Sequence, residues 1–286
     1  MTAIQMLIKD IKNLKPVPAI ANQIVEMVDD PSVAMHDIAK IIEYDPAVTA
    51  SLIRTCNSAF FGLANPVESV KDAVSILGID QVVELTLLNA SAKTLNRSWK
   101  GYGLNEGALW RHAVSSALIA KDIAAKIAPE SRNTIFTAAL LKDIGKTVLD
   151  KFIQISSEKI QTLIDNDGYS FVEAEKKVIG ADHAEIGAML AKMWKFSPKM
   201  VKIIRNHHIP DETIGYDTDI AIVYLSDCIC MMMGVGVGLD GLSYRFNDKI
   251  IRELAISPND IANIIADFTF NMQKVEALLG VVKDAK

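Results

Sequence analysis

Histidines and aspartates that could together bind a metal ion are spread over the second half of this 286-residue chain. Four of the five histidines and two aspartates lie inside apolar segments or at the ends of such segments. Imidazole and carboxylate groups are the ligands that divalent transition metals commonly take in proteins. The candidate metal ligands are His112, Asp143, His183, His207, His208 and Asp227.

Each of these residues also has a purely structural interpretation, because buried polar groups are usually hydrogen-bonded and helix ends attract caps and charges. The alternatives are a hydrogen-bonded core side chain for His112, a helix N-cap for His183, a helix C-terminal position for His207 and His208, an arginine partner for Asp227, and a solvated ion pair for Lys142 with Asp143. We favour a metal-type site because all of these residues occur in segments that are expected to pack together.

The segment FTAALLKDIGKTVLD, residues 136–150, raises a specific question about charge. Its apolar run leads directly into the pair Lys142–Asp143, which is costly to bury unless a neighbour neutralises it. Gly145 follows, and we expect it to adopt the left-handed conformation that commonly ends a helix. The charged pair should therefore lie at the end of a buried helix.

The sequence predicts an all-α fold, because apolar residues recur at helical spacing and show no sustained two-residue alternation. Local signals support several boundaries: Asp45 precedes Pro46, Ser69 precedes Asp72 by three residues, and Gly78 ends the same segment. Helices are expected at about 20–28, 38–42, 46–56, 69–78, 80–95, 108–127, 131–142, 150–165, 170–178, 184–195, 198–207, 217–233 and 258–280.

The polar, glycine-containing stretch NRSWKGYGLNEG at 96–107 is the best internal boundary. It separates an N-terminal helical lobe, residues 1–97, from a second helical lobe, residues 98–235, that carries the candidate metal ligands. Residues 236–286 form a C-terminal helical segment.

Composition restricts the possible partners and locations. The chain has 30 Lys and Arg against 35 Asp and Glu, a net charge of −5, which argues against nucleic acid as a partner. The three cysteines form neither a zinc-binding nor a disulfide pattern, so we expect a cytoplasmic protein. Residues 220–239 are apolar over about the length of a bilayer span, but Asp227 near their middle favours a buried core helix and no membrane span.

The order of these residues resembles the HD superfamily of metal-dependent phosphohydrolases and, more closely, the HDOD domain, an HD-related output domain of bacterial signalling proteins. In the first lobe the resemblance rests on LKPVPAIANQIVEMVDDP, IAKIIEYDPAVTASLIRTCNSAFFG and VKDAVSILGIDQVVELTLLNA. In the second lobe it rests on LWRHAVSSALIA, TAALLKDIGKTVL and IGADHAEIGAMLAKMWKFSPKMVKIIRNHH. These segments cover about residues 14–208 and imply a two-lobed helical HDOD architecture with an HD-phosphohydrolase-like core in the second lobe.

The resemblance implies a first metal held by His112, position 142, Asp143 and Asp227. Here the chain departs from the family pattern, because Lys142 replaces the histidine of the HD pair. A protonated lysine has no lone pair and cannot ligate a metal. We expect the Lys142 ammonium to take the place of the first metal and to balance the two aspartates.

The resemblance also implies a second metal, which would share Asp143 and take His183 with His207 or His208. That set suits a single Fe, Mn or Zn ion. Lys146 matches the lysine of the family's HDxGK motif and could contact a phosphate. Its alternative is a solvated cation at a helix end.

Three functions are compatible with this degenerate set of ligands. We favour a non-catalytic signalling module that binds a partner protein or a small ligand, because loss of a metal ligand usually removes hydrolytic activity. The main alternative is a metal-dependent phosphohydrolase acting on a nucleotide or cyclic dinucleotide, since the other ligands survive. A structural scaffold with an inert pocket is the third. The pocket would accordingly hold one divalent metal or none.

Overall fold

The computed structural model describes residues 23–24, 27, 33–58, 61–208, 217–243 and 248–269 of the chain. Within these residues the regular elements are helices and no β-strand occurs, so the predicted all-α class is confirmed. The helix expected at about 20–28 lies almost entirely outside the described residues, and the one expected at 258–280 is described only as far as residue 269.

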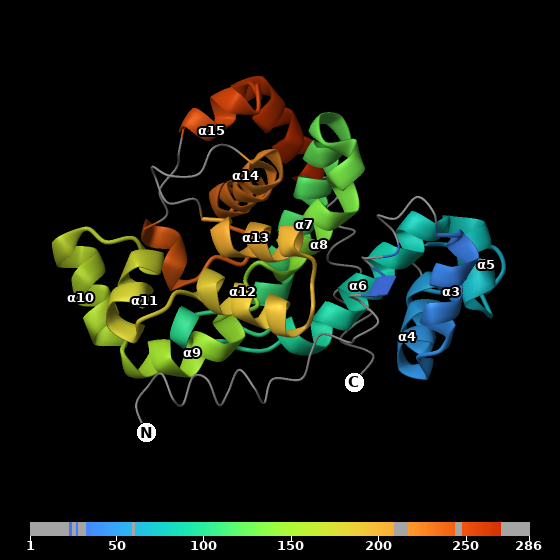
Figure 1. Cartoon of the computed structure of the whole chain (residues 1–286), viewed down its shortest axis with the longest axis horizontal. Helices are drawn as coiled ribbons and strands as arrows, with labels where there is room; N and C mark the ends of the chain where they lie inside the picture. Colours follow the sequence, from blue (N-terminus) through green and yellow to red (C-terminus); the bar gives the residue numbers. More distant parts are fainter. Residues whose placement is uncertain are drawn as a thin grey trace.

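A group of short helices lies at one end of the molecule, and α6 leads from it to the remaining helices (Figure 1). These elements are α3 (Met35–Glu43), α4 (Pro46–Cys56), α5 (Val70–Leu77) and α6 (Ile79–Leu95). The predicted caps are present. The Asp45 carboxylate accepts a hydrogen bond from the Val48 amide at 3.1 Å, and the Ser69 hydroxyl accepts one from the Asp72 amide at 3.0 Å.

The larger group of helices surrounds α7, which packs against both α8 and α14. Its elements, with η marking 3-10 helices, are η1 (Lys100–Tyr102), α7 (Ala108–Ile127), η2 (Pro129–Ser131), α8 (Arg132–Leu141), α9 (Lys146–Ile155), α10 (Ser157–Asp167), α11 (Phe171–Ile179), α12 (His183–Met193), α13 (Pro198–Asn206), α14 (Thr218–Met232), η3 (Leu239–Ser243), α15 (Asp248–Glu253) and a further helix over 258–269. The core of this group positions the candidate ligands.

Two local predictions were wrong. The single helix expected at 150–165 is two helices, because the backbone leaves helical geometry at Ser156 between α9 and α10. Gly145 is not left-handed: its φ is −62°, and it directly precedes α9. Glycine is required there for space, since a Cβ would lie 1.9 Å from the His183 carbonyl oxygen and 2.8 Å from the Gly187 nitrogen. This close approach brings α9 against α12.

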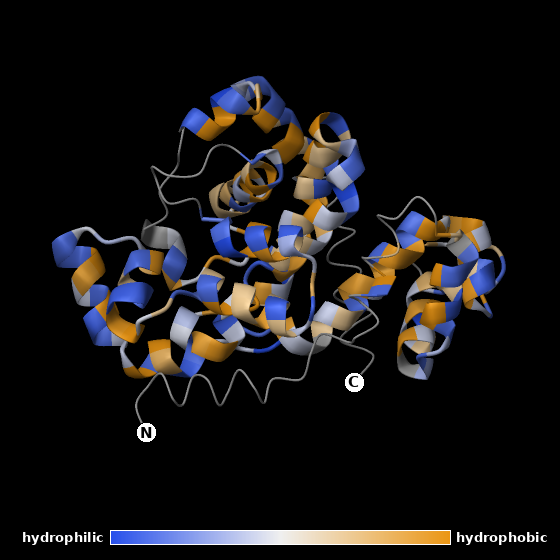
Figure 2. Cartoon of the chain, in the orientation of Figure 1, coloured by the Kyte–Doolittle hydropathy of each residue, from blue (hydrophilic) through white to orange (hydrophobic). Residues whose placement is uncertain are grey.

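The distribution of apolar residues follows the packing. In Figure 2 the outer helices α9 and α10 show both apolar and polar residues around their circumference, and α6 likewise shows polar residues between apolar ones. The helix α14 is the most apolar segment and is almost wholly buried. No helix among the described residues is long and apolar enough to cross a bilayer.

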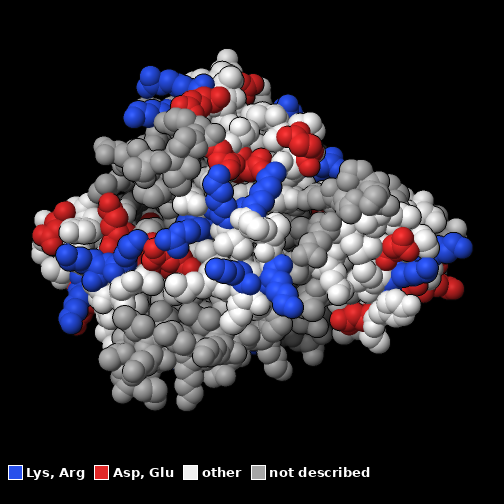
Figure 3. Space-filling view, viewed as in Figure 1, with Lys and Arg blue, Asp and Glu red and all other residues white. Residues whose placement is uncertain are grey.

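Surface charges are mostly paired on the face drawn in Figure 3, where basic and acidic side chains lie next to each other. Along α13, Lys199 lies 2.7 Å from Asp219 and Lys202 lies 2.6 Å from Asp217. Pairs of this kind, exposed on one side to water, contribute little to stability.

Candidate functional site

The structure brings all the candidate metal ligands together in one pocket. His112 comes from α7, Asp143 follows α8, His183 opens α12, and Asp227 lies within α14. The ligand atoms form two groups that share Asp143, and within each group they lie within 4.8 Å of one another. The groups are His112, Asp143 and Asp227, and Asp143, His183, His207 and His208. All are buried except His208, which is half-buried.

A lysine ammonium occupies the centre of the first group. Lys142 forms an ion pair with Asp143 Oδ2, and its Nζ lies 2.6 Å from Asp227 Oδ1. His112 Nε2 donates a hydrogen bond to Asp227 Oδ1 at 2.7 Å, and its Nδ1 donates one to the Val235 carbonyl at 2.8 Å. Both aspartates are thus already neutralised by protein groups.

The ionisation of the first group follows from these contacts. Burial alone would raise the pKa of Asp143 and Asp227, but the positive charge of Lys142 beside them lowers both pKa values well below the ordinary range. Burial alone would lower the pKa of Lys142, yet the two carboxylates raise it above its usual value. Lys142 is therefore an ammonium ion at pH 7 and has no lone pair for a metal.

A second buried lysine contacts the other oxygen of Asp143. Lys146 Nζ lies 2.9 Å from Asp143 Oδ1 and 2.6 Å from Asp240 Oδ2, and it lies over the Tyr102 ring, 5.6 Å from its centroid. The interpretation of Lys146 as a solvated cation was therefore wrong. Sequence analysis missed Asp240, because its role depends on η3 packing on α11, which brings the carboxylate to Lys146. The only sequence signal is a lone carboxylate in the glycine-rich run GVGVGLDGLS.

The second group of ligand atoms could hold one of the two metals that the family resemblance implies. His183 Nε2 lies 3.5 Å from Asp143 Oδ1, and His207 Nε2 lies 3.9 Å from the same oxygen. The His207 Nδ1–H donates to the Ile204 carbonyl at 2.7 Å, so Nε2 carries the lone pair, and this buried atom makes no hydrogen bond. Burial lowers the pKa of His207 to about 3, so its imidazole is neutral at pH 7. His208 Nε2 lies 2.8 Å from His183 Nε2.

The ordinary interpretations of three residues were wrong. The N-cap of α12 is Asp182, whose carboxylate accepts the Glu185 amide at 2.7 Å, and not His183. Asp227 contacts a lysine and a histidine in the first group in place of the expected arginine. Lys142 has no exposed surface, so it is not part of a solvated pair. His112 is hydrogen-bonded in the core, as its structural interpretation required, and also belongs to the cluster.

The two positions differ in their fit to a divalent cation. The first position does not fit, because the Lys142 ammonium lies between the two aspartates that would have to bind the ion. The second position has the donors for such an ion, because Asp143, His183 and His207 present one carboxylate and two imidazoles, with an unpartnered nitrogen on His207. An ion there would share Asp143 Oδ1 with the Lys146 ammonium, which lies 2.9 Å from that oxygen. Such an ion would supply Lewis acidity and bind an anion or a water molecule.

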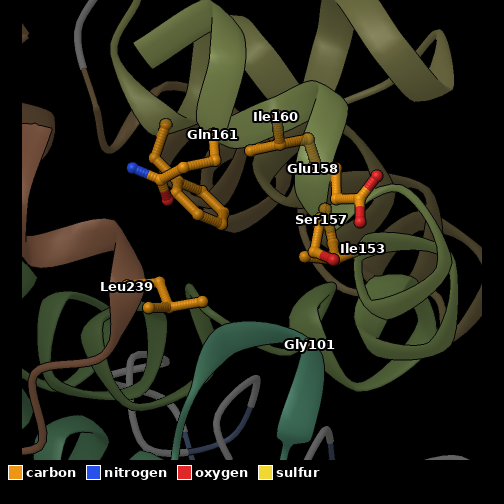
Figure 4. A pocket seen from close by; sticks show the side chains of 8 residues that line it. Gly101, Ile153, Ser157, Glu158, Ile160, Gln161 and Leu239 are labelled. Carbon is orange, nitrogen blue, oxygen red and sulfur yellow. The ribbon is translucent and has the colours of Figure 1, made fainter. Parts of the chain in front are cut away.

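A shallow cavity of about 260 Å³ lies outside this pocket. Its walls are mainly the apolar side chains of Ile153, Ile160, Phe171 and Leu239 (Figure 4). No histidine or aspartate of the cluster lines it. Phe171 separates it from Tyr102, with ring centroids 5.7 Å apart. The cavity therefore lies beside the metal-type site and does not open onto it.

The chain is thus an all-helical protein with a buried cluster of histidine and aspartate side chains. The cluster lies at the junction of α7, α8, α12, α13 and α14. A family profile described as the HDOD domain matches residues 14–210, and the chain belongs to this family. This confirms the resemblance that the motifs indicated over about residues 14–208.

Solved structures with the same fold include an HDOD domain protein of unknown function from Geobacter sulfurreducens, at 28% identity and a TM-score of 0.69 over 94% of this chain and 92% of that one. A "Putative phosphohydrolase" from Shewanella amazonensis SB2B has 20% identity and a TM-score of 0.70, with 97% and 98% of the chains covered. A "Putative signal transduction protein" from Marinobacter aquaeolei VT8 has 21% identity and a TM-score of 0.76, with 98% and 66% covered.

A curated relative from Treponema pallidum (strain Nichols), described as an uncharacterized protein, is 24% identical over 208 residues. The match covers 69% of this chain but 38% of that protein, so this chain corresponds to well under half of the relative's length.

Proposed function

We propose that the chain is a non-catalytic regulatory module of bacterial signal transduction, which binds a protein partner or a small ligand. The observation that carries the proposal is the Lys142 ammonium between Asp143 and Asp227. Hydrolysis of a phosphodiester by a metal centre needs a well-held cation to generate hydroxide and to bind the phosphate oxygens. Lys142 occupies the place where the first such cation would have to bind.

The enclosure of the pocket supports the same function. Lys142 and His183 have no exposed surface, and His112, Asp143 and Asp227 each expose 1%. A nucleotide could not contact these groups without moving the segments that cover them. Sealed, charge-balanced polar clusters serve structure and specificity more readily than catalysis.

The partner expected for such a module is a signalling protein. The Marinobacter aquaeolei relative is longer than this chain, which covers 66% of it, and its printed description is that of a signal transduction protein. This description supports a role in signal transduction.

A second candidate function is a metal-dependent phosphohydrolase acting on a nucleotide or a cyclic dinucleotide. One observation favours it: the unpartnered His207 Nε2 converges with His183 and Asp143 on the second position. A single Fe, Mn or Zn ion at that position, with Lys146 released to bind a phosphate, would be its minimal centre.

Metal content and hydrolysis measured together distinguish these functions. The parent chain, purified without chelators or added metal, should hold at most about one equivalent of metal and leave bis(p-nitrophenyl) phosphate and cyclic dinucleotides intact with added Mn²⁺. Lys142→His should bind additional metal, whereas Lys199→His, on the surface of α13, should not. Circular dichroism checks that each variant is folded. Metal-dependent turnover by the parent would overturn the non-catalytic function.

A further inference from the structure

Glu175 of α11 is a buried carboxylate that contacts the candidate ligand His183 at Nδ1, the ring nitrogen that does not belong to the metal-type position. Its Oε2 accepts a hydrogen bond from His183 Nδ1 at 2.8 Å and another from the His183 amide at 3.0 Å. Because the first bond places hydrogen on Nδ1, Nε2 is the ring nitrogen on the side of the cluster, 2.8 Å from His208 Nε2 and 3.5 Å from Asp143 Oδ1. Glu175 therefore sets both the tautomer and the ring orientation of His183.

Tyr102 holds the other oxygen of this carboxylate. Its hydroxyl donates to Glu175 Oε1 at 2.6 Å, and its ring packs edge-on to His183, with centroids 6.3 Å apart. The backbone beside Tyr102 is fixed against α9: the Gly101 amide donates to Asp150 Oδ1 at 2.8 Å, and a Cβ at Gly101 would lie 2.0 Å from the Asp150 carbonyl oxygen. The position of Tyr102 is thus determined by packing as well as by its hydrogen bond.

Glu175 is fully buried, with no exposed surface. Within the described part of the chain both of its carboxylate oxygens have a partner, Oε2 in His183 and Oε1 in Tyr102. The His183 ring therefore cannot turn without breaking a buried hydrogen bond.

We propose that Glu175 and Tyr102 are positioning residues that make His183 a ligand for one divalent cation at the Asp143–His183–His207 position. This goes beyond the proposed function, which needs no metal: Lys142 takes the first position, and the second position remains for an ion. A carboxylate that accepts the other N–H of a metal-binding histidine raises the basicity of the ligand and fixes its orientation. Glu175 provides that acceptor, and Tyr102 holds the acceptor in place.

Calorimetric titration of metal-free protein with Zn²⁺ tests the proposal. Glu175→Gln should weaken the affinity about 10- to 100-fold, and Tyr102→Phe, which removes one hydroxyl, should weaken it less. The matched control is Glu173→Gln, the same change two residues earlier on α11, where the side chain caps the helix by bonding the Ser170 amide. Glutamine preserves that cap, so the affinity should match the parent.

A second readout is independent of the metal. ¹⁵N-detected NMR of the His183 ring in the metal-free parent should show hydrogen on Nδ1, and Glu175→Gln should broaden or shift that signal while Glu173→Gln leaves it unchanged. A parent that binds Zn²⁺ no more tightly than Glu175→Gln overturns this inference alone. A parent with no Zn²⁺ affinity also overturns the inference, whereas the proposed function, which needs no metal, is overturned only by metal-dependent turnover.

Discussion

The Lys142 ammonium lies 2.6 Å from Asp227 Oδ1 in a place where neither residue exposes more than 1% of its surface. The cost of removing both charges from water offsets much of their attraction, so such a pair adds little net stability. Removing one partner is different, because the remaining charge stays buried and unbalanced. We therefore expect Lys142 to be necessary for the stability of the folded chain.

Replacing Lys142 by methionine should destabilise the protein by about 3–5 kcal/mol, because methionine fills similar space but leaves Asp143 and Asp227 without their main cation. Urea denaturation at pH 7, followed by circular dichroism, measures this change. Lys199→Met is the control, since it removes the partly exposed partner of Asp219 and should cost at most about 1 kcal/mol. Equal losses for the two variants would contradict the structural role of Lys142.

Asp240 should hold the glycine-rich segment 234–243 against the pocket. Asp240→Ala removes the 2.6 Å ion pair with Lys146, a charge-assisted hydrogen bond, so local opening of this segment should become about 10- to 100-fold more frequent. Hydrogen–deuterium exchange of peptides that cover the segment reports that opening.

The control for Asp240 is Asp165→Ala, which changes an exposed carboxylate on α10 that bonds only its neighbour Gln161 among the described contacts. Exchange in segment 234–243 should match the parent in this variant. If Asp240→Ala also leaves the segment as protected as before, the glycine-rich packing alone holds it. Gly236 and Gly238, which approach Ala108 and Tyr102 closely, would then carry that packing.

Local signals in the sequence were enough to predict most of the helices, and the resemblance to the HD and HDOD families implied that the ligands converge. The periodicity of apolar residues and caps such as Asp45 are set within one or two helical turns, so they can be read without the tertiary fold. The sequence also showed that position 142 departs from the family's HD pair, because a lysine beside a buried aspartate is a charge that needs a partner.

Residues whose roles depend on contacts between distant elements could not be predicted. Glu175 and Tyr102 are 73 positions apart and meet only because η1 packs on α9 and α11. The available signal was weak: Glu175 lies one helical turn after Phe171, on the apolar face of its helix. The prediction for Gly145 was wrong because the small size of this glycine serves packing against α12, whereas the sequence pattern suggested a conformational role.

Glu185 of α12 should make stability fall in acid. Burial alone would raise the pKa of Glu185, but hydrogen bonds from Lys176 at 2.9 Å and Arg205 at 3.0 Å, together with their charges, lower it below its ordinary value. A carboxyl group whose pKa is lower in the folded chain stabilises that chain above its unfolded pKa of about 4.3, and this contribution disappears as the pH falls through the folded pKa.

The unfolding free energy of the parent and of Glu185→Gln, measured in urea from pH 7 down to pH 3, isolates this contribution. The two proteins should differ most at pH 7 and converge in acid, because protonated glutamate and glutamine are then both neutral. Glu158→Gln, on the exposed side of α10, should run parallel to the parent over the whole range. A Glu185→Gln difference that is constant with pH would mean that the carboxylate shape, and not its charge, joins α11 and α13 to α12.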